Sequence, residues 1–294
     1  MTEQFFCKQV RPRETTYSDC LDIAEVLCRG FENDGIMEYV RGPQYTPNPS
    51  YSVILQQGIQ DPRERLNEMI TWSKRYRTLI HSWARFIHTI LLTRGNDIYV
   101  AVDSETDKPV GLSCWVYPPH MEDDLEKELG RTGVFWKVYA FCTKLKYKVC
   151  DFFLQLCGNH PVRNERARQM YMERTETVDP KTTVDDMAKL SSSELAEARY
   201  PLRSMIYCRF FAISPDYHRR GLGQKLMNYS LANIPSVPTP FSSTLSGPQK
   251  LYLEASPSGF GMYKKTGWTY SGISVLPSYL PPHKCDNHLM FYTR

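Results

Sequence analysis

The sequence lacks an apolar run of the length that a membrane-spanning helix needs. Its first residues, MTEQFFCKQVRPRE, contain no apolar stretch, so we expect no signal peptide. The nine cysteines include no CxxC pair. An odd number of scattered cysteines without metal-ligand spacing predicts reduced, mostly buried thiols and no metal site. Together these absences favour a globular protein of the cytoplasm.

A large excess of one charge is also missing. Lysine and arginine number 36 against 32 acidic residues, a formal net charge of +4. This is far from the charge density of nucleic-acid-binding proteins, so no nucleic-acid partner is expected, although the bias suits an anionic cofactor. Apolar residues make up 41% of the 294 positions, enough for a core, and we expect one domain over residues 1–294.

The stretch SPDYHRRGLGQKLM, residues 214–227, separates a strand-like run, MIYCRFFAI, from a helix-like run. The first turn of a helix leaves its N–H groups open and carries partial positive charge. Glycines let a ligand approach this backbone closely, and Arg219 and Arg220 add full charge. The pattern predicts a cradle for a pyrophosphate. A plain turn with two solvated arginines is the alternative.

Two better-known phosphate motifs are absent. The chain has no GxxxxGK[ST] loop, and the dinucleotide pattern GxGxxG fails because Leu226 occupies the third glycine position after Gly221 and Gly223. Periodicity and turn residues elsewhere predict the order β-α-α-β-β-(insert)-β-α-β-α-β-β, a mixed α/β fold. Its clearest elements are a helix over about 61–92 and a hairpin over 97–102 and 110–117.

The insert covers residues 118–200 and reads as mainly helical, with a further capped helix expected at SSSELAEA. Within it, residues 134–157 are apolar on most faces and carry only a narrow polar stripe. That stripe consists of Lys137, Lys144, Lys148 and Asp151. Such a helix is more often buried against its domain than laid on a membrane surface, so we expect burial.

The strand, turn and helix around residues 205–233 resemble the GNAT superfamily of N-acetyltransferases, which bind acetyl-coenzyme A. That family carries the motif [QR]xxGx[GA], here matched by residues 218–223 except that His218 replaces Gln or Arg. LYLEASPSGFGMYKKTGW, residues 251–268, resembles the family's fifth strand and fourth helix. The resemblance is specific over about 205–270, extends plausibly over 1–117, and is absent from 118–200.

The resemblance implies a GNAT-like fold with a long helical insertion between the third and fourth strands. It also implies acetyl-CoA as the acyl-donor cosubstrate, without a metal. The residues expected to hold it are Phe211, Ala212, Ile213, His218, Arg219, Arg220, Gly221, Leu222, Gly223, Gln224, Ser256 and Ser258. Tyr263 stands where the family often has its general acid.

Glu254 is the best base candidate in this region. Strand alternation puts it on the face opposite Leu251, Leu253 and Ala255, and a carboxylate ending a central strand needs a role or a partner. A structural pair with a lysine is the alternative.

The implied activity is acetyl transfer from acetyl-CoA to the amine of a small molecule, by direct attack. The insert would cover the acceptor site and line it with aromatic side chains. A protein or peptide N-acetyltransferase and a catalytically silent acyl-CoA-binding module remain alternatives. Oligomeric state and the acceptor do not follow from the sequence.

Overall fold

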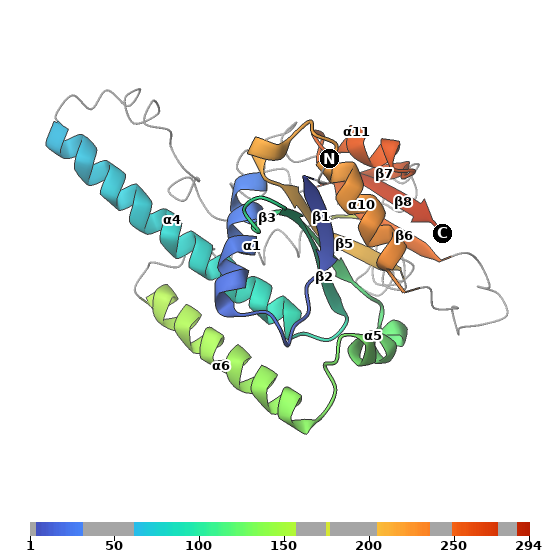
Figure 1. The fold of residues 1–294 in the computed structure, drawn as a ribbon, viewed down its shortest axis with the longest axis horizontal. Helices are drawn as coiled ribbons and strands as arrows, with labels where there is room; N and C mark the ends of the chain where they lie inside the picture. The colour runs from blue at the N-terminus through green and yellow to red at the C-terminus, as the bar shows by residue number, and fades with distance from the viewer. Residues whose placement is uncertain (1–3, 32–61, 157–174, 177–204, 236–248, 276–286) are drawn as a thin grey trace.

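A computed structural model shows one mixed sheet with helices on both faces (Figure 1). It describes residues 4–31, 62–156, 175–176, 205–235, 249–275 and 287–294. The strands are β1 (Phe5–Gln9), β2 (Asn96–Asp103), β3 (Pro109–Val116), β4 (Thr175–Glu176), β5 (Ile206–Ile213), β6 (Lys250–Ala255), β7 (Thr269–Val275) and β8 (Asn287–Thr293). The helices are α1 (Tyr17–Gly30), α4 (Pro62–Leu91), α5 (Glu122–Glu128), α6 (Val134–Leu156), α10 (Leu222–Asn233) and α11 (Phe260–Lys265), with short 3₁₀ turns η2 (Pro119–Met121) and η3 (Pro215–Tyr217).

The described strands follow the order β1-β2-β3-β5-β6-β8-β7-β4. Each pair is antiparallel except β5 and β6, which run parallel. The predicted mixed α/β class and hairpin are confirmed, and the long helix runs unbroken from Pro62 to Leu91. Most of the loop expected at 234–249, the proline loop at 42–50 and the helix expected at SSSELAEA lie outside the described residues.

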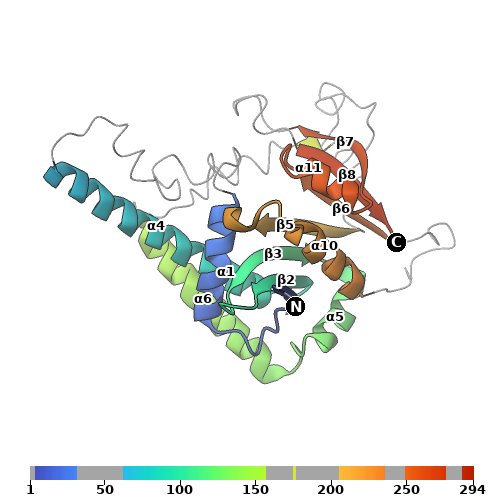
Figure 2. The same ribbon diagram turned by 45° about the horizontal axis from the view of Figure 1, so that its top comes forward.

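The two faces of the sheet are covered by different helices. On one face α1 and α4 bury Ile23, Leu27, Leu79 and Ile87 against apolar residues of β2 and β3. On the other face, α10 packs mainly on β1, β2 and β3 and also contacts β5, and α11 lies beside α10. Strands β6, β8 and β7, together with α11, turn away from the half of the sheet that contains β1, β2 and β3 (Figure 2). The sheet therefore has a change of direction between β5 and β6.

Helix α1 begins and ends under tight local constraints. Thr16 accepts a hydrogen bond from the Asp19 N–H, and the Asp19 carboxylate accepts one from the Thr16 N–H, a reciprocal cap. At the other end, Gly30 lies directly on β5, since a Cβ added there would come within 2.7 Å of Ala212 Cβ. The absence of a side chain lets the helix sit close to the strand that carries the candidate site.

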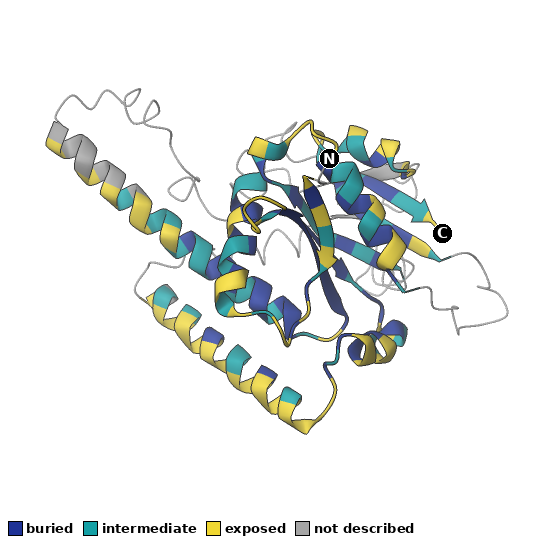
Figure 3. Cartoon of the chain, viewed as in Figure 1, coloured by how far each residue is buried: buried dark blue, intermediate teal, exposed yellow. Residues whose placement is uncertain are grey.

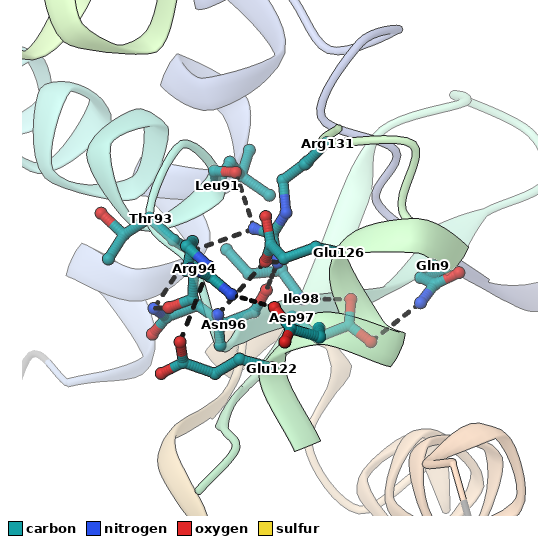
Figure 4. Close-up of polar contacts among 12 residues, drawn as sticks. Gln9, Leu91, Thr93, Arg94, Asn96, Asp97, Ile98, Glu122, Glu126 and Arg131 are labelled. Carbon is teal, nitrogen blue, oxygen red and sulfur yellow. Dashed lines mark hydrogen bonds and ion pairs between the residues drawn. The ribbon is translucent and has the colours of Figure 1, made fainter. Parts of the chain in front are cut away.

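A buried arginine joins the end of α4, the start of β2 and the end of α5 (Figure 4). The Arg131 guanidinium donates to the Leu91 and Thr93 carbonyls at 2.9 and 3.0 Å and to the Asn96 carbonyl at 2.9 Å. Its Nη2 lies 2.7 Å from Glu126 Oε1, and both side chains are almost fully buried. Partnered on several sides, this charge is a structural element of the fold.

Asp97 lies beside this network. It accepts hydrogen bonds from the Gln9 amide and its neighbour's N–H, and burial raises the pKa of its carboxyl to about 6. In the sheet register this end of β2 is opposite Trp115 of β3, whereas the turn after Ile213 is opposite Gly111. The network therefore supports the end of the sheet away from the candidate site.

The described part of the insert corrects one expectation. Helix α6 packs along α4, where Tyr147 contacts His88 and Asp151 pairs with Arg85, and its remaining apolar face is exposed (Figure 3). Phe135 is 94% exposed and Phe141 64%, so the expected burial of this helix is wrong. The expectation that the insert covers the acceptor site stays a prediction. The remainder of the insert, apart from β4, lies outside the described residues.

Among the described helices, none is both long enough and apolar enough to cross a membrane.

We predict that Arg131→Met destabilises the protein by about 3 to 5 kcal/mol, because Glu126 would remain buried without its countercharge. Urea unfolding followed by circular dichroism measures this free energy. Lys127→Met, a change at an exposed neighbour, should cost less than about 0.5 kcal/mol. Equal small losses in the two variants would show that Arg131 does not hold these elements together.

Candidate active site

The candidate site lies where β5 and β6 part. Their parallel pairing covers only Ile206 with Leu251, Tyr207 with Tyr252, and Cys208 with Leu253. Strand β5 nevertheless continues to Ile213, held on its other side by β3. In the part of the chain that the structure describes, no strand pairs with this last stretch of β5 on the β6 side. Backbone groups on that side have no strand partner and are available for a ligand, apart from the Ile213 carbonyl, which has a partner in the following turn.

A bulge in β5 marks the point of parting. Cys114 of β3 pairs with Phe210 and the next residue, Trp115, with Cys208, so Arg209 is an extra residue in β5. A bulge bends the strand and changes which face its side chains occupy. Cys208 accordingly packs in the core beneath α10 and α11, whereas Phe210 packs against α1 and α4. Nothing in the sequence distinguished this bulge.

The turn after β5 is held by side chains from its own residues. The His218 ring lies with Nε2 3.0 Å from the Ile213 carbonyl oxygen, so Nε2 carries the donated proton. Arg219 and Gly221 both take left-handed backbone conformations, with φ of 61° and 75°. A non-glycine residue in that region is uncommon and costs conformational energy. His218, which replaces the Gln or Arg of the GNAT motif, closes this turn through its bond to the Ile213 carbonyl.

Helix α10 presents its N-terminal donors at this turn. Its first bond runs from the Lys225 N–H to the Gly221 carbonyl, so the N–H groups of Leu222, Gly223 and Gln224 precede it. A Cβ added at Gly221 would meet no atom within 4 Å, so space is open there. The side chain of Leu222 is buried in the core, and only its backbone faces this space.

Two contacts fix the turn to the rest of the fold. The Tyr217 hydroxyl donates to Asp103 Oδ2 at 2.8 Å, and the Arg220 guanidinium lies 5.3 Å from the centre of the Tyr217 ring. Hydrogen bonds from the Glu105 N–H and from Tyr217 lower the pKa of the Asp103 carboxyl, which stays ionised. Exposed arginines 219 and 220 are thus carried on a rigid turn rather than on a free loop.

Tyr263 is buried on the α11 side of the parted strands. Its ring centre lies 5.8 Å from that of Phe211, one of the residues expected to face the cofactor. Burial, and then the neighbouring Cys208 and Tyr207, raise the pKa of its phenol well above the usual value. Burial likewise raises the pKa of the Cys208 thiol, which excludes an activated thiolate there.

Glu254 lies on the other face of β6, as strand alternation predicts. Leu251, Leu253 and Ala255 are buried on the opposite face, whereas Glu254 is half-buried. The Tyr207 hydroxyl donates to its Oε2 at 3.4 Å, and the Tyr207 ring stacks on Tyr252 with centres 4.6 Å apart. The structure thus places the Tyr207 hydroxyl of β5 beside the Glu254 carboxylate.

Ser256 and Ser258 are occupied in shaping the chain before α11. Their hydroxyl oxygens lie 3.0 Å apart, and the Gly259 N–H donates to Ser256 Oγ at 3.3 Å. These bonds hold the entry to α11, and with it the position of Tyr263.

Aromatic residues from α1 and α4 surround Phe210, which the sequence did not single out. The rings of Phe31, Trp83 and Phe86 lie edge-on to it, at centre distances of 6.4, 6.3 and 5.9 Å. The Arg209 guanidinium lies over both Phe86 and Phe210. Among the described residues, the aromatic wall on this face of β5 comes from α4 and from Phe31 at the end of α1.

No protein-family model matches the chain, and no curated protein matches it either. Solved structures do. One is described as histone acetyltransferase HPA2 and related acetyltransferase, from Corynebacterium glutamicum: 15% identity, TM-score 0.43, 98% of this chain and 96% of that one. A mosquito arylalkylamine N-acetyltransferase-like protein is 13% identical with a TM-score of 0.39, and the match covers 99% of this chain and 100% of that one. A Vibrio cholerae spermidine N-acetyltransferase solved with CoA and spermine is 12% identical with a TM-score of 0.37, and the match covers 99% of this chain and 95% of that one.

Matches of this size carry no inference about activity. The fold class follows instead from the order of the described elements, the parallel pairing of β5 with β6 and the glycine turn before α10. The fold is GNAT-like, as the motif in residues 218–223 predicts.

Gly221 and Gly133 form a matched pair for testing the turn. Both have positive φ, 75° and 99°, and an added Cβ would meet nothing within 4 Å at either. We predict that Gly221→Ala and Gly133→Ala each lower the free energy of unfolding by about 1 kcal/mol, the cost of the left-handed backbone alone. Urea unfolding measures both. A loss of several kcal/mol confined to Gly221→Ala would show that the turn is closely packed instead of open.

Proposed function

We propose that the protein is an N-acetyltransferase that transfers the acetyl group of acetyl-CoA to the amine of a small molecule. The observation that carries the proposal is the parting of β5 and β6 beside an open, positively charged turn. An extended thiol-ended cofactor with a pyrophosphate needs both features: a strand edge for its arm and N–H donors for its phosphates.

The described residues fit such a cofactor. Open space at Gly221, the N–H groups at the start of α10 and the exposed Arg219 and Arg220 would receive the pyrophosphate. The free edge of β5 at Phe211 and Ile213 would hold the pantetheine arm. Acetyl-CoA supplies an acetyl group activated as a thioester; the chain supplies its position.

Proton handling falls to groups on the two faces of the sheet. Glu254 would accept the proton of the attacking amine, with Tyr207 holding its carboxylate in place. Tyr263 would face the departing sulfur. Because an alkyl thiol has a pKa near 8.5, below that of the buried phenol, Tyr263 donates a hydrogen bond first. Tyr263 transfers its proton to the thiolate only where burial also raises the pKa of the thiol.

The acceptor would approach from the face of α1 and α4. Phe210 with its surrounding rings, and the stacked Tyr207 and Tyr252, form an apolar, aromatic boundary on that side. Such a boundary suits an amine with an apolar body better than a charged peptide backbone. The acceptor class proposed is therefore a small, partly apolar amine.

Tyr263→Phe tests the acid role. We predict a fall in kcat of about 100-fold, the usual scale of general acid catalysis, with acetyl-CoA affinity within about twofold of wild type. The assay follows thiol release with a panel of amines. Because the phenol pKa is raised, ionisation of Tyr263 should cause no loss of rate up to about pH 9.

Tyr270→Phe, at an exposed tyrosine a few residues on, is the matched control and should leave kcat unchanged. Acetyl-CoA binding without thiol release for any amine or peptide would contradict transfer and favour a silent acyl-CoA-binding module. Release with peptides alone would move the acceptor class to proteins.

Glu254→Gln tests the base. We predict at least a tenfold fall in kcat/KM for alkylamines, which have pKa values near 10 and arrive protonated. Weakly basic amines, already neutral at pH 7, should be acetylated at nearly the wild-type rate. A loss independent of amine pKa would contradict proton acceptance by Glu254 and leave it a positioning residue.

A further inference from the structure

The exposed apolar surface of the described residues is concentrated on one helix. Of thirteen exposed large hydrophobic side chains, ten belong to α6. Exposed apolar surface gathered in this way marks an interaction site rather than chance exposure. The proposed acetyl transfer makes no use of this helix, since α6 packs on the outer side of α4 (Figures 1 and 3).

The exposed residues form a continuous stripe. They recur every three or four positions along the whole helix: Val134, Val138, Phe141, Leu145, Val149, Phe152 and Leu156. Phe135 and Phe153 extend the stripe on one side. The opposite side of the helix carries Ala140 and Tyr147, which are buried, and Asp151, which is paired with Arg85 at 2.8 Å. One face thus holds the helix on the domain and the other is fully apolar.

Lysines border the stripe on both sides. At 100° per residue, Lys137 and Lys148 fall along one edge and Lys146 along the other, and all three are exposed. The only acidic residue of α6 is Asp151, which already pairs with Arg85 on the protein side. The outward half of the helix is therefore apolar at its centre and purely cationic at its edges.

We propose that α6 lies on anionic lipid bilayers, with its apolar stripe in the interface and its lysines at the headgroups. An apolar face with aromatic residues, bordered by lysines, is the composition of an interfacial helix. The lysine stems reach along the apolar surface and leave the charges at headgroup level. At 23 residues, α6 is about 35 Å long and can lie flat without spanning.

The same charges argue against pairing of α6 with a second copy of itself. Paired helices place acidic residues against lysines at the edges of their apolar seam. Two copies of α6 would bring lysine against lysine, because the outward half has no acid to offer. A phosphatidylserine surface supplies the missing negative charge.

Co-sedimentation of the full chain with large vesicles tests the proposal. We expect binding to phosphatidylcholine vesicles containing about 30 mol% phosphatidylserine, but not to phosphatidylcholine alone, at about 0.15 M salt. Raising the salt to about 0.5 M should weaken binding by screening the lysines. Circular dichroism and urea unfolding establish that each variant is folded.

Two variants separate the apolar and the charged contributions. Phe141→Asp/Phe152→Asp should abolish co-sedimentation, and Lys137→Glu/Lys146→Glu/Lys148→Glu should weaken it at least about tenfold. Ile70→Asp and Lys74→Glu make the same kinds of change at exposed positions of α4 and should leave binding intact.

Failure of folded wild-type protein to sediment with anionic vesicles would overturn the proposal. So would binding that survives Phe141→Asp/Phe152→Asp. A dimer in light scattering that this variant converts to monomer, without vesicle binding, would instead make the stripe an interface between copies. Acetyl-CoA binding serves as an independent readout, since none of these residues lies at the candidate active site.

Discussion

Strand β5 has to remain paired with β3 along its whole length while it leaves β6 after three residue pairs. The extra residue at Arg209 meets this requirement, because the bulge bends β5 at the point where the pairing with β6 ends. Everything in the candidate site follows from that separation. Without it the edge of β5 would be hydrogen-bonded to β6, and Tyr263 would pack against a closed sheet. The turn at Gly221 would only begin an ordinary crossover from β5 through α10 to β6.

The turn and the separation reinforce each other. His218 bonds to the carbonyl of Ile213, the last residue of β5, so the end of the strand and the start of α10 move as one unit. Tyr217 connects the same unit to Asp103 at the end of β2. The strained backbone at Arg219 is tolerated because these contacts surround it. Preorganised donors of this kind bind an anion without first paying for loop ordering.

Local patterns in the sequence predicted the turn, its glycines and the order of elements, because each depends on residues close together in the chain. Glu254 could be placed on its face of β6 for the same reason. The bulge at Arg209 could not be predicted from the sequence. Strand β5 has apolar residues on both faces, so an extra residue does not interrupt any alternation of polar and apolar positions. The partners of Arg131 and the rings around Phe210 come from distant segments. Helix α6 looked buried because composition records apolar residues but not whether anything covers them.

The most direct test of the central claim is calorimetric titration of acetyl-CoA into the wild-type protein and into Arg220→Glu/Gly221→Glu. Gly133→Glu serves as the control for a charged side chain at an open, left-handed glycine. The structure predicts micromolar binding to wild type and to the control, and a loss of at least about tenfold in the double variant. Equal binding by all three proteins would contradict a pyrophosphate site at this turn, and no binding by any would remove acyl-CoA from the account.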